Sequence, residues 1–247
     1  DQNVAHGTHI SKITVDPRLK IRISTGIDFV DEGLGYGGFV PSSITMLTGD
    51  PGSGKTTMLM QVADSLTKQG NAVLFNTGEQ AAEQVAMVAE RLGLKNGFYI
   101  GTDKLTNKLF ENAGKIRTQN PGKQLFIFQD SLPTLDDGYY PSGWTNGQTP
   151  LKVTEQFVAH AKKTFDIVVF INHVTKGGQF IGKNTLLHAI DGHMSINFDR
   201  EKKSPTFGER LFRVSKNRYG VAGVVSILGI KSSGVYRKGL IEEFEAA

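Results

Sequence analysis

The sequence predicts an α/β fold with a mostly parallel central sheet, helices on its faces and an antiparallel extension near the C-terminus. Three observations lead to this prediction. Strand-length apolar runs alternate with helix-length amphipathic segments through most of the chain. A Gly-rich turn joins the first of these strands to a long helix. After residue 193 the helical segments stop, and short strand-like segments follow one another.

The alternating part begins with an apolar strand, SITMLTG at 43–49, and a helix from about Lys55 to Lys68. The elements expected after them are strands at 71–78, 97–101, 124–130 and 165–172 and helices at 79–93, 103–119 and 149–164. Two of the strands, QLFIFQD and FDIVVFIN, are apolar without interruption, as expected for strands buried on both faces of a parallel sheet.

The remaining segments complete the predicted organisation. HMSINFD, RLFRVSK and GVVSILGI follow one another without helices, which predicts the antiparallel extension. Residues 1–24 show little periodicity and are expected to form an arm, and 25–247 a single domain. Two long Gly-rich loops, 131–150 and 173–192, are candidates for function, because long loops in compact domains are usually functional or disordered.

Composition narrows the possible classes of protein. The 247 residues include no cysteine, which excludes disulfides and thiolate metal sites, and the six histidines lack HxxxH spacing. The longest apolar runs are strand-length and no signal segment opens the chain, so we expect a cytoplasmic protein without a membrane span. A net charge of +4 is compatible with nucleic-acid binding but is weak evidence for it. The chain begins with Asp1, which suits a piece of a longer protein.

GDPGSGKT at 49–56 fits the phosphate-binding motif G-x4-G-K-[ST], with a strand before it and a helix after it. Glycines allow backbone N–H groups to wrap phosphates, and the helix N-terminus adds a positive dipole. Lys55 is expected to reach the β- and γ-phosphates, and Thr56 to ligate Mg²⁺. We therefore predict ATP and Mg²⁺ as cofactors. The residues expected to bind the nucleotide are Gly49, Asp50, Pro51, Gly52, Ser53, Gly54, Lys55, Thr56 and Thr57.

Three more side chains are candidates for this site. Asp130 ends an apolar strand, where a second group on the magnesium side is normally found; the alternative is a helix N-cap. Glu79 follows the second strand and is the candidate base for the attacking water; the alternative is a first-turn helix glutamate. His173 ends the IVVFIN strand and is a candidate γ-phosphate sensor or, equally, a structural histidine.

Several segments together resemble the ATPase core of the RadA/Sms family, a bacterial branch of the RecA-fold ATPases. The family's entry segment and P-loop resemble RISTGIDFVDEGLGYGGFVPSSITMLTGDPGSGKTT. Its S-G-E-E/S element, with the catalytic glutamate, resembles NTGEQ, and its G-H-V-T-K-x-G resembles NHVTKGG. Its K-N-R-F-G signature resembles KNRYG, with Tyr219 for Phe. The resemblance covers about residues 20 to 230 and implies a RecA-like ATPase domain at 25–247 that assembles as a ring, expected to be a hexamer.

The resemblance also gives a role to VSKNRYG at 214–220. Lys216 and Arg218 are two residues apart, so on a strand they share a face about 6.6 Å apart. Taken alone, the segment is compatible with a solvated edge strand, where Lys is common. In RecA-like rings the nucleotide lies between subunits, and the resemblance implies that Lys216 and Arg218 act on a neighbour's γ-phosphate.

The chain also departs from the family. Family members carry a four-cysteine zinc module and a protease-like domain, for which this chain has neither cysteines nor enough residues. The family's G-P-R-V-L-E-H run reads GKNTLLH at 182–188, which puts individual DNA contacts in doubt. The candidate contacts are Lys176, Lys183 and Asn184. The chain is thus expected to be an isolated core or a divergent stand-alone relative, as in a phage or mobile element.

Three functions remain open at this point. The first is an ATP-dependent motor of the RadA type, stimulated by single-stranded DNA, that drives branch migration or unwinding with a recombinase or replication partner. The second is a KaiC-like regulatory ATPase without DNA binding, and the third is a DnaB-type helicase core. Basic Gly-rich loops favour the first. Trp144 and the Tyr139–Tyr140 pair are candidates for stacking on bases, although loop aromatics more often pack against a core.

Overall fold

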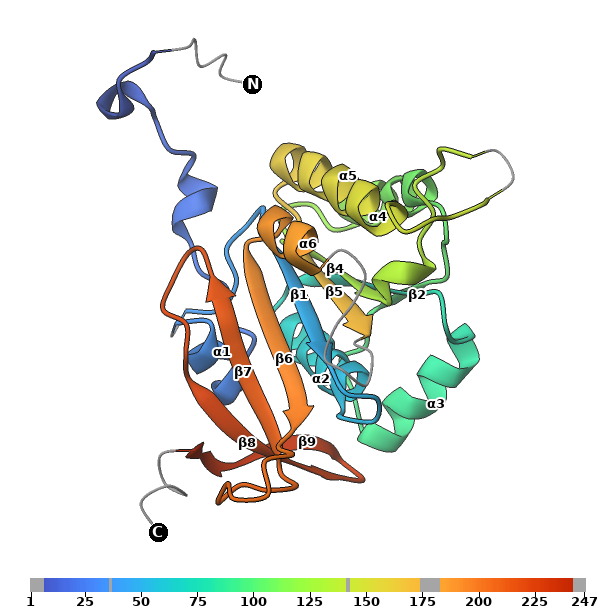
Figure 1. Ribbon diagram of the computed structural model, residues 1–247. Coiled ribbons are helices and arrows are strands. Elements are labelled where there is room, and N and C mark those ends of the chain that lie inside the picture. Colours follow the sequence, from blue (N-terminus) through green and yellow to red (C-terminus); the bar gives the residue numbers. More distant parts are fainter. Residues whose placement is uncertain (1–6, 36, 141–142, 174–182, 242–247) are drawn as a thin grey trace.

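A computed structural model describes residues 7–35, 37–140, 143–173 and 183–241 (Figure 1). Its centre is a nine-stranded sheet in the order β3-β2-β4-β5-β1-β6-β7-β8-β9. The strands are β1 (Ile44–Gly49), β2 (Ala72–Thr77), β3 (Tyr99–Gly101), β4 (Leu125–Asp130), β5 (Ile167–His173), β6 (Gly192–Phe198), β7 (Arg210–Asn217), β8 (Val225–Lys231) and β9 (Gly234–Leu240). The predicted fold class, a mostly parallel sheet with an antiparallel C-terminal part, is confirmed.

The boundary between the parallel and antiparallel parts differs from the prediction. HMSINFD was expected in the antiparallel extension, but β6 runs parallel to β1, with Thr45 opposite Gly192. The antiparallel part begins only at β7, which pairs with β6 so that Asn217 lies opposite Gly192. The direction of β6 is set by the preceding chain, which returns from the end of β5 to the opposite end of the sheet. That return is a long-range feature that periodicity does not reveal.

Helices cover both faces of the sheet (Figure 1). They are α1 (Asp28–Gly33), α2 (Lys55–Lys68), α3 (Ala82–Leu92), α4 (Thr106–Gln119), α5 (Thr149–Thr164) and α6 (Lys183–Ala189). The predicted bounds of α2 and α5 are confirmed, whereas α3 and α4 begin three residues later than predicted. The short helices α1 and α6 and the strand β9 were not predicted.

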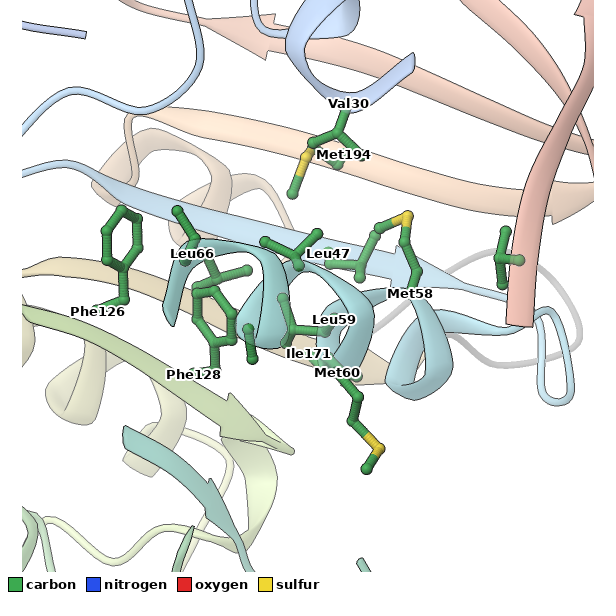
Figure 2. Packing of buried hydrophobic residues seen from close by; sticks show 14 of the residues in the cluster. Val30, Leu47, Met58, Leu59, Met60, Leu66, Phe126, Phe128, Ile171 and Met194 are labelled. Carbon is green, nitrogen blue, oxygen red and sulfur yellow. The ribbon is translucent and has the colours of Figure 1, made fainter. Parts of the chain in front are cut away.

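Alternation along the strands divides the core into two layers. In β1, Leu47 packs in a cluster with α2, while Ile44 and Met46 pack in a second cluster with α4 and α5. Figure 2 shows the first cluster, where Leu59 of α2 lies close to Leu47. Because side chains alternate between the faces of a strand, a single apolar strand serves both layers.

The arm contacts the domain through Arg18, whose guanidinium lies 3.6 Å from the centre of the Phe165 ring, and through Arg22, which donates to the carbonyl oxygen of Tyr219. It contains two short 3-10 helices, η1 (Ile10–Lys12) and η2 (Pro17–Lys20), and then a single antiparallel bridge between Ile23 and Phe39. The third 3-10 helix, η3 (Leu132–Thr134), follows β4. Within the described ranges, no helix is both long enough and apolar enough to cross a membrane.

Candidate active site

The P-loop follows β1 and leads directly into α2. Gly49 has φ 148°, and a Cβ there would lie 2.0 Å from the carbonyl oxygen of Ile196, so only glycine fits against β6. Gly54 precedes α2 with φ 102° and supplies no side chain to cap the helix. The first N–H groups of α2 therefore remain available to an anion, as in other phosphate-binding helix termini.

Lys55 is buried at the start of α2, with 5% of its surface exposed. Its Nζ donates to the carbonyl oxygens of Gly49, at 3.0 Å, and Asp50, at 2.8 Å. Burial lowers the pKa of Lys55, while the charges of Asp130, Asp50 and Glu79 oppose that shift. The ammonium group is thus desolvated and held only by neutral acceptors, a state in which anionic phosphate oxygens would stabilise its charge.

Asp130 and Thr56 meet beside this lysine. The hydroxyl of Thr56 donates to Oδ2 of Asp130 at 2.7 Å. The other oxygen, Oδ1, is buried and has no hydrogen-bond partner among the described residues, and the same holds for Oγ of Ser53 in the P-loop. Burial raises the pKa of Asp130, the Thr56 hydrogen bond opposes the shift, and the charge of Glu79 adds to it. A hydroxyl and a carboxylate with a free oxygen fit the hard oxygen ligands that Mg²⁺ prefers.

Glu79 lies at the same end of the sheet as the P-loop, between β2 and α3. Its Oε1 accepts a hydrogen bond from the Ser131 hydroxyl and lies 3.0 Å from Nε2 of His173. Because α3 begins at Ala82, Glu79 is not in the first turn of that helix, where Glu83 stands instead. Asp130 likewise caps no helix, since its carboxylate is turned to Thr56. The two helix alternatives for these residues are therefore wrong.

We call this region the P-loop end of the sheet, where β1, β2, β4 and β5 end at Gly49, Thr77, Asp130 and His173. The parallel register brings these ends level, with Thr77 opposite Asp130 and Gly49 opposite His173. The structure therefore brings together four predicted site residues, Lys55, Glu79, Asp130 and His173.

Lys216 and Arg218 lie at the opposite end, which we call the Asp191 end, where β1 and β6 begin and β7 finishes. Nζ of Lys216 donates to the carbonyl oxygens of Leu187 (2.5 Å) and Ile190 (2.7 Å), at the end of α6. Arg218 forms an ion pair with Asp191, Nη1 to Oδ1 at 2.7 Å. Burial and then the charge of Arg218 lower the pKa of Lys216. The two cations do converge, but on their own chain.

Asp191 ties this region to the first strand of the sheet. Its Oδ2 accepts the N–H of Ile44, the first residue of β1, and its own N–H donates to the carbonyl of Ile44. A β-bulge between His193 and Met194 inserts an additional residue into β7 beside Lys216. Arg218 lies beyond the strand, in the turn after Asn217, so it reaches Asp191 through the turn rather than by strand alternation.

Sequence reasoning missed two residues of the P-loop end. Ser131 holds the Glu79 carboxylate, and its only signal was its position directly after Asp130. Arg200, from the segment between β6 and β7, pairs with Asp50, Nη2 to Oδ1 at 2.9 Å. Asp50 also accepts a hydrogen bond from the N–H of Phe198 through Oδ2. The Asp50 side chain thus holds the P-loop against the segment after β6, and it does not compete for the backbone N–H groups of the loop. No sequence pattern pointed to Arg200.

The DNA-contact candidates are only partly described. Lys176 lies outside the described residues, and Lys183 and Asn184 begin α6, where Asn184 is exposed. The aromatic side chains of the other long loop do not pack into the core, since Tyr139 is 66% and Trp144 58% exposed. Their rings meet edge-on through Tyr140, at centroid distances of 4.8 and 5.0 Å.

Sheet order, P-loop and strand-end carboxylates define a P-loop ATPase core with the RecA-like fold. A family model described as "ATPase: KaiC" matches residues 23–126. A solved structure described as an ATPase domain superposes with a TM-score of 0.73 at 12% identity, covering 89% of this chain and 92% of that one.

The relatives found by sequence indicate which type of RecA-like ATPase core this is. The chain is 32% identical to DNA repair protein RadA of Mycobacterium tuberculosis over 215 residues, 85% of this chain and 42% of the relative. It is 31% identical to RadA of Mycolicibacterium smegmatis over 228 residues, 90% of this chain and 46% of the relative. RadA of Streptococcus pyogenes is 32% identical over 201 residues, 81% of this chain and 42% of the relative. The chain fits a RadA-type RecA-fold ATPase core, and it spans less than half the length of these relatives.

Proposed function

We propose that the chain is the ATP-hydrolysing core of a RadA-type DNA motor, which works as a ring on single-stranded DNA in recombination or repair. The relatives are DNA repair proteins by name, and the P-loop end has the groups that nucleotide hydrolysis requires. The ring, expected to be a hexamer, and a recombinase or replication partner belong to this proposal.

The contacts at the P-loop end support the following roles. Lys55 and the N-terminus of α2 would bind the phosphates, while Thr56 and Asp130 would hold Mg²⁺, which would supply charge neutralisation at the phosphates. Glu79 is the general base, and the Ser131 hydroxyl, by donating to Oε1, fixes its orientation. His173 lies 3.0 Å from the same oxygen, so a change at the γ-phosphate would reach Glu79 through it.

The separation of the two ends of the sheet is the observation that carries the proposal. Arg218 is anchored by Asp191, which bonds to Ile44, and β1 then runs five residues further to Gly49. At about 3.3 Å per residue that is roughly 16 Å, more than an arginine side chain spans. Lys216 and Arg218 therefore serve no phosphate on their own P-loop. A head-to-tail contact, in which the Asp191 end of one subunit meets the P-loop end of the next, would bring them together.

DNA binding is assigned to the loops that leave the P-loop end. The segment 174–189 connects His173 at that end with Ile190 at the other, and contains the candidate contacts Lys176, Lys183 and Asn184. Tyr139 and Trp144, exposed on the loop after β4, are suitable for stacking on unpaired bases.

A regulatory ATPase without DNA binding is the second candidate, because the matching family model carries the KaiC description. It shares the P-loop chemistry and the subunit contact, and differs in its response to DNA. An ATPase rate unchanged by single-stranded DNA would favour it.

Mixing two inactive variants tests the shared subunit site. Arg218→Ala removes the trans cation and Lys55→Ala the P-loop lysine, so each variant alone is expected to be inactive. In a random 1:1 mixture, about a quarter of interfaces combine an intact P-loop with an intact Arg218, and we expect recovery up to that fraction. Lys115→Ala, on the exposed face of α4, is the matched control and should retain full activity.

Subunit exchange is measured in parallel with labelled chains. Zero activity at every ratio, with exchange shown, would refute the trans assignment. So would Arg218→Ala protein that hydrolyses ATP at the normal rate by itself.

A further inference from the structure

The side chains of Glu79, Asp130 and His173 have the composition of a transition-metal site. Their ligand atoms, two carboxylate oxygens and one imidazole nitrogen, all lie within 4.8 Å of one another. Imidazole nitrogen is a donor that Mg²⁺ rarely uses and that Zn²⁺ favours. Catalytic zinc sites commonly have three protein ligands, with a fourth position open to solvent.

The spacing of the donors suits one ion. Nε2 of His173 and Oε1 of Glu79 are 3.0 Å apart. Around a tetrahedral ion with bonds of 2.0–2.2 Å, adjacent ligand atoms are about 3.3–3.6 Å apart, so this hydrogen-bonded pair would have to open by about 0.3–0.6 Å to bind one ion. The His173 and Glu79 side chains are 44% and 38% exposed, which leaves an ion and its water an approach from solvent.

A second observation, which also supports the Mg²⁺ site, points to a missing cation. Oδ1 of Asp130 has no hydrogen-bond partner among the described residues, and Asp130 is only 4% exposed. A buried carboxylate oxygen without a partner is costly, and a cation is the strongest way to satisfy it. The other oxygen of this carboxylate stays with the Thr56 hydroxyl, so the two oxygens face different neighbours.

The local charge also favours a cation. Two carboxylates, Glu79 and Asp130, face one ammonium group, Lys55, whose Nζ is hydrogen-bonded to backbone carbonyls. The nearby carboxylate of Asp50 is paired with Arg200, and its charge also acts on Lys55.

We propose that Glu79, Asp130 and His173 bind a Zn²⁺ ion in the nucleotide-free protein, at a site that shares Asp130 with the proposed Mg²⁺ site and differs from it by the donors Glu79 and His173. Zn²⁺ binding itself does not depend on the proposed function; only the expected effect of Zn²⁺ on ATP hydrolysis does. A bound Zn²⁺ occupies the carboxylate of the proposed general base, so Zn²⁺ should inhibit hydrolysis while leaving the P-loop lysine free.

Calorimetric titration of Zn²⁺ into the nucleotide-free, untagged protein, with Mg²⁺ present in excess, tests the site. We expect one saturable site per chain, weakened at least about tenfold in His173→Gln and in Glu79→Gln. Both residues are partly exposed, so the variants should fold, and circular dichroism verifies this. His9→Gln, which changes an exposed histidine of the arm, is the matched control and should bind normally.

Saturable binding that is unchanged in either variant, or equally weakened in His9→Gln, would overturn the assignment, as would no binding at all. Because no nucleotide is present, the result is independent of the ATPase. Intact Zn²⁺ binding in a protein that hydrolyses no ATP would refute the proposed function alone. Normal hydrolysis without Zn²⁺ binding would refute the zinc site alone.

Discussion

The P-loop end and the Asp191 end of the sheet hold their charges in opposite ways. At the P-loop end, Lys55 and Asp130 are buried, and within the part of the chain that the structure describes, Oδ1 of Asp130 and Oγ of Ser53 lack hydrogen-bond partners. At the Asp191 end, Lys216 has two carbonyl acceptors and Arg218 a carboxylate, with the Arg218 side chain 54% exposed. The first end leaves polar groups that a ligand could satisfy. The second is satisfied within its own chain.

This difference has a consequence for subunit contact. If Lys216 and Arg218 bind a neighbour's phosphate, as proposed, they must first exchange their partners on the Leu187–Asp191 segment. Since that segment ends α6, the exchange would release the end of the loop that carries the candidate DNA contacts. Nucleotide and DNA sites would thus be coupled through one set of hydrogen bonds.

The largest effect is expected for Lys55→Ala at the P-loop end. Loss of the lysine removes a charged donor to the phosphates, and hydrolysis should fall at least about 10²–10³-fold. Because burial makes the ammonium costly, the fold should survive, which thermal unfolding of the free protein measures. Near-normal hydrolysis would mean that this end is not the nucleotide site.

Glu79→Gln should bind ATP normally and turn it over about 10²-fold more slowly, the usual contribution of a general base. Equilibrium binding of a fluorescent ATP analogue and steady-state hydrolysis separate the two effects. Glu83→Gln, in the first turn of α3 and exposed, is the control and should hydrolyse ATP normally. Undiminished turnover in Glu79→Gln would move the base to Asp130 or His173.

Salt dependence of DNA binding tests the segment that connects the two ends. Each phosphate contact contributes about −0.7 to the log–log salt slope for single strands, so replacing Lys176 and Lys183 with Ala should flatten the slope by up to about 1.4. The control replaces Lys108 and Lys115, both exposed on α4, for the same change in net charge. Equal slopes in the two double variants would remove the loop from the DNA site.

Asp130→Asn should raise the stability of the nucleotide-free protein. This smaller effect tests whether the P-loop end, unlike the Asp191 end, holds a buried charge at a cost in stability. The folded-state pKa of Asp130 is raised, mainly by burial, so the charged form opposes folding at pH above that pKa. A gain of about 0.5–2 kcal/mol at pH 7 corresponds to a rise in Tm of a few degrees.

The pH dependence of this gain in stability tests whether the charged form of Asp130 is its cause. As pH falls through the folded pKa of Asp130 and below its unfolded value, the carboxyl becomes neutral in both states, and the advantage of Asn should vanish. An advantage that persists or grows at low pH would contradict burial as the cause.

Most of the parallel core could be predicted from the sequence, and the predicted phosphate site could be located in it. The P-loop is contiguous, so one turn, one helix N-terminus and one lysine are specified by eight neighbouring residues. The periodicity of α2 and α5 likewise gave their bounds, because helical burial is a local pattern. The resemblance to RadA, drawn from short segments, was confirmed by relatives that cover most of the chain.

The pairing and direction of distant strands, and the side chains that they bring together, could be seen only in the tertiary structure. The polar edge strand β9 carries little apolar alternation, and the direction of β6 depends on pairing with β1. Glu79, Asp130, Ser131 and His173 become one cluster only through the register of three strands. The register of β7 on β6 likewise sets Lys216 and Arg218 far from their own P-loop. Strand order and register arise from long-range backbone pairing, which leaves no local mark on the residues that it brings together.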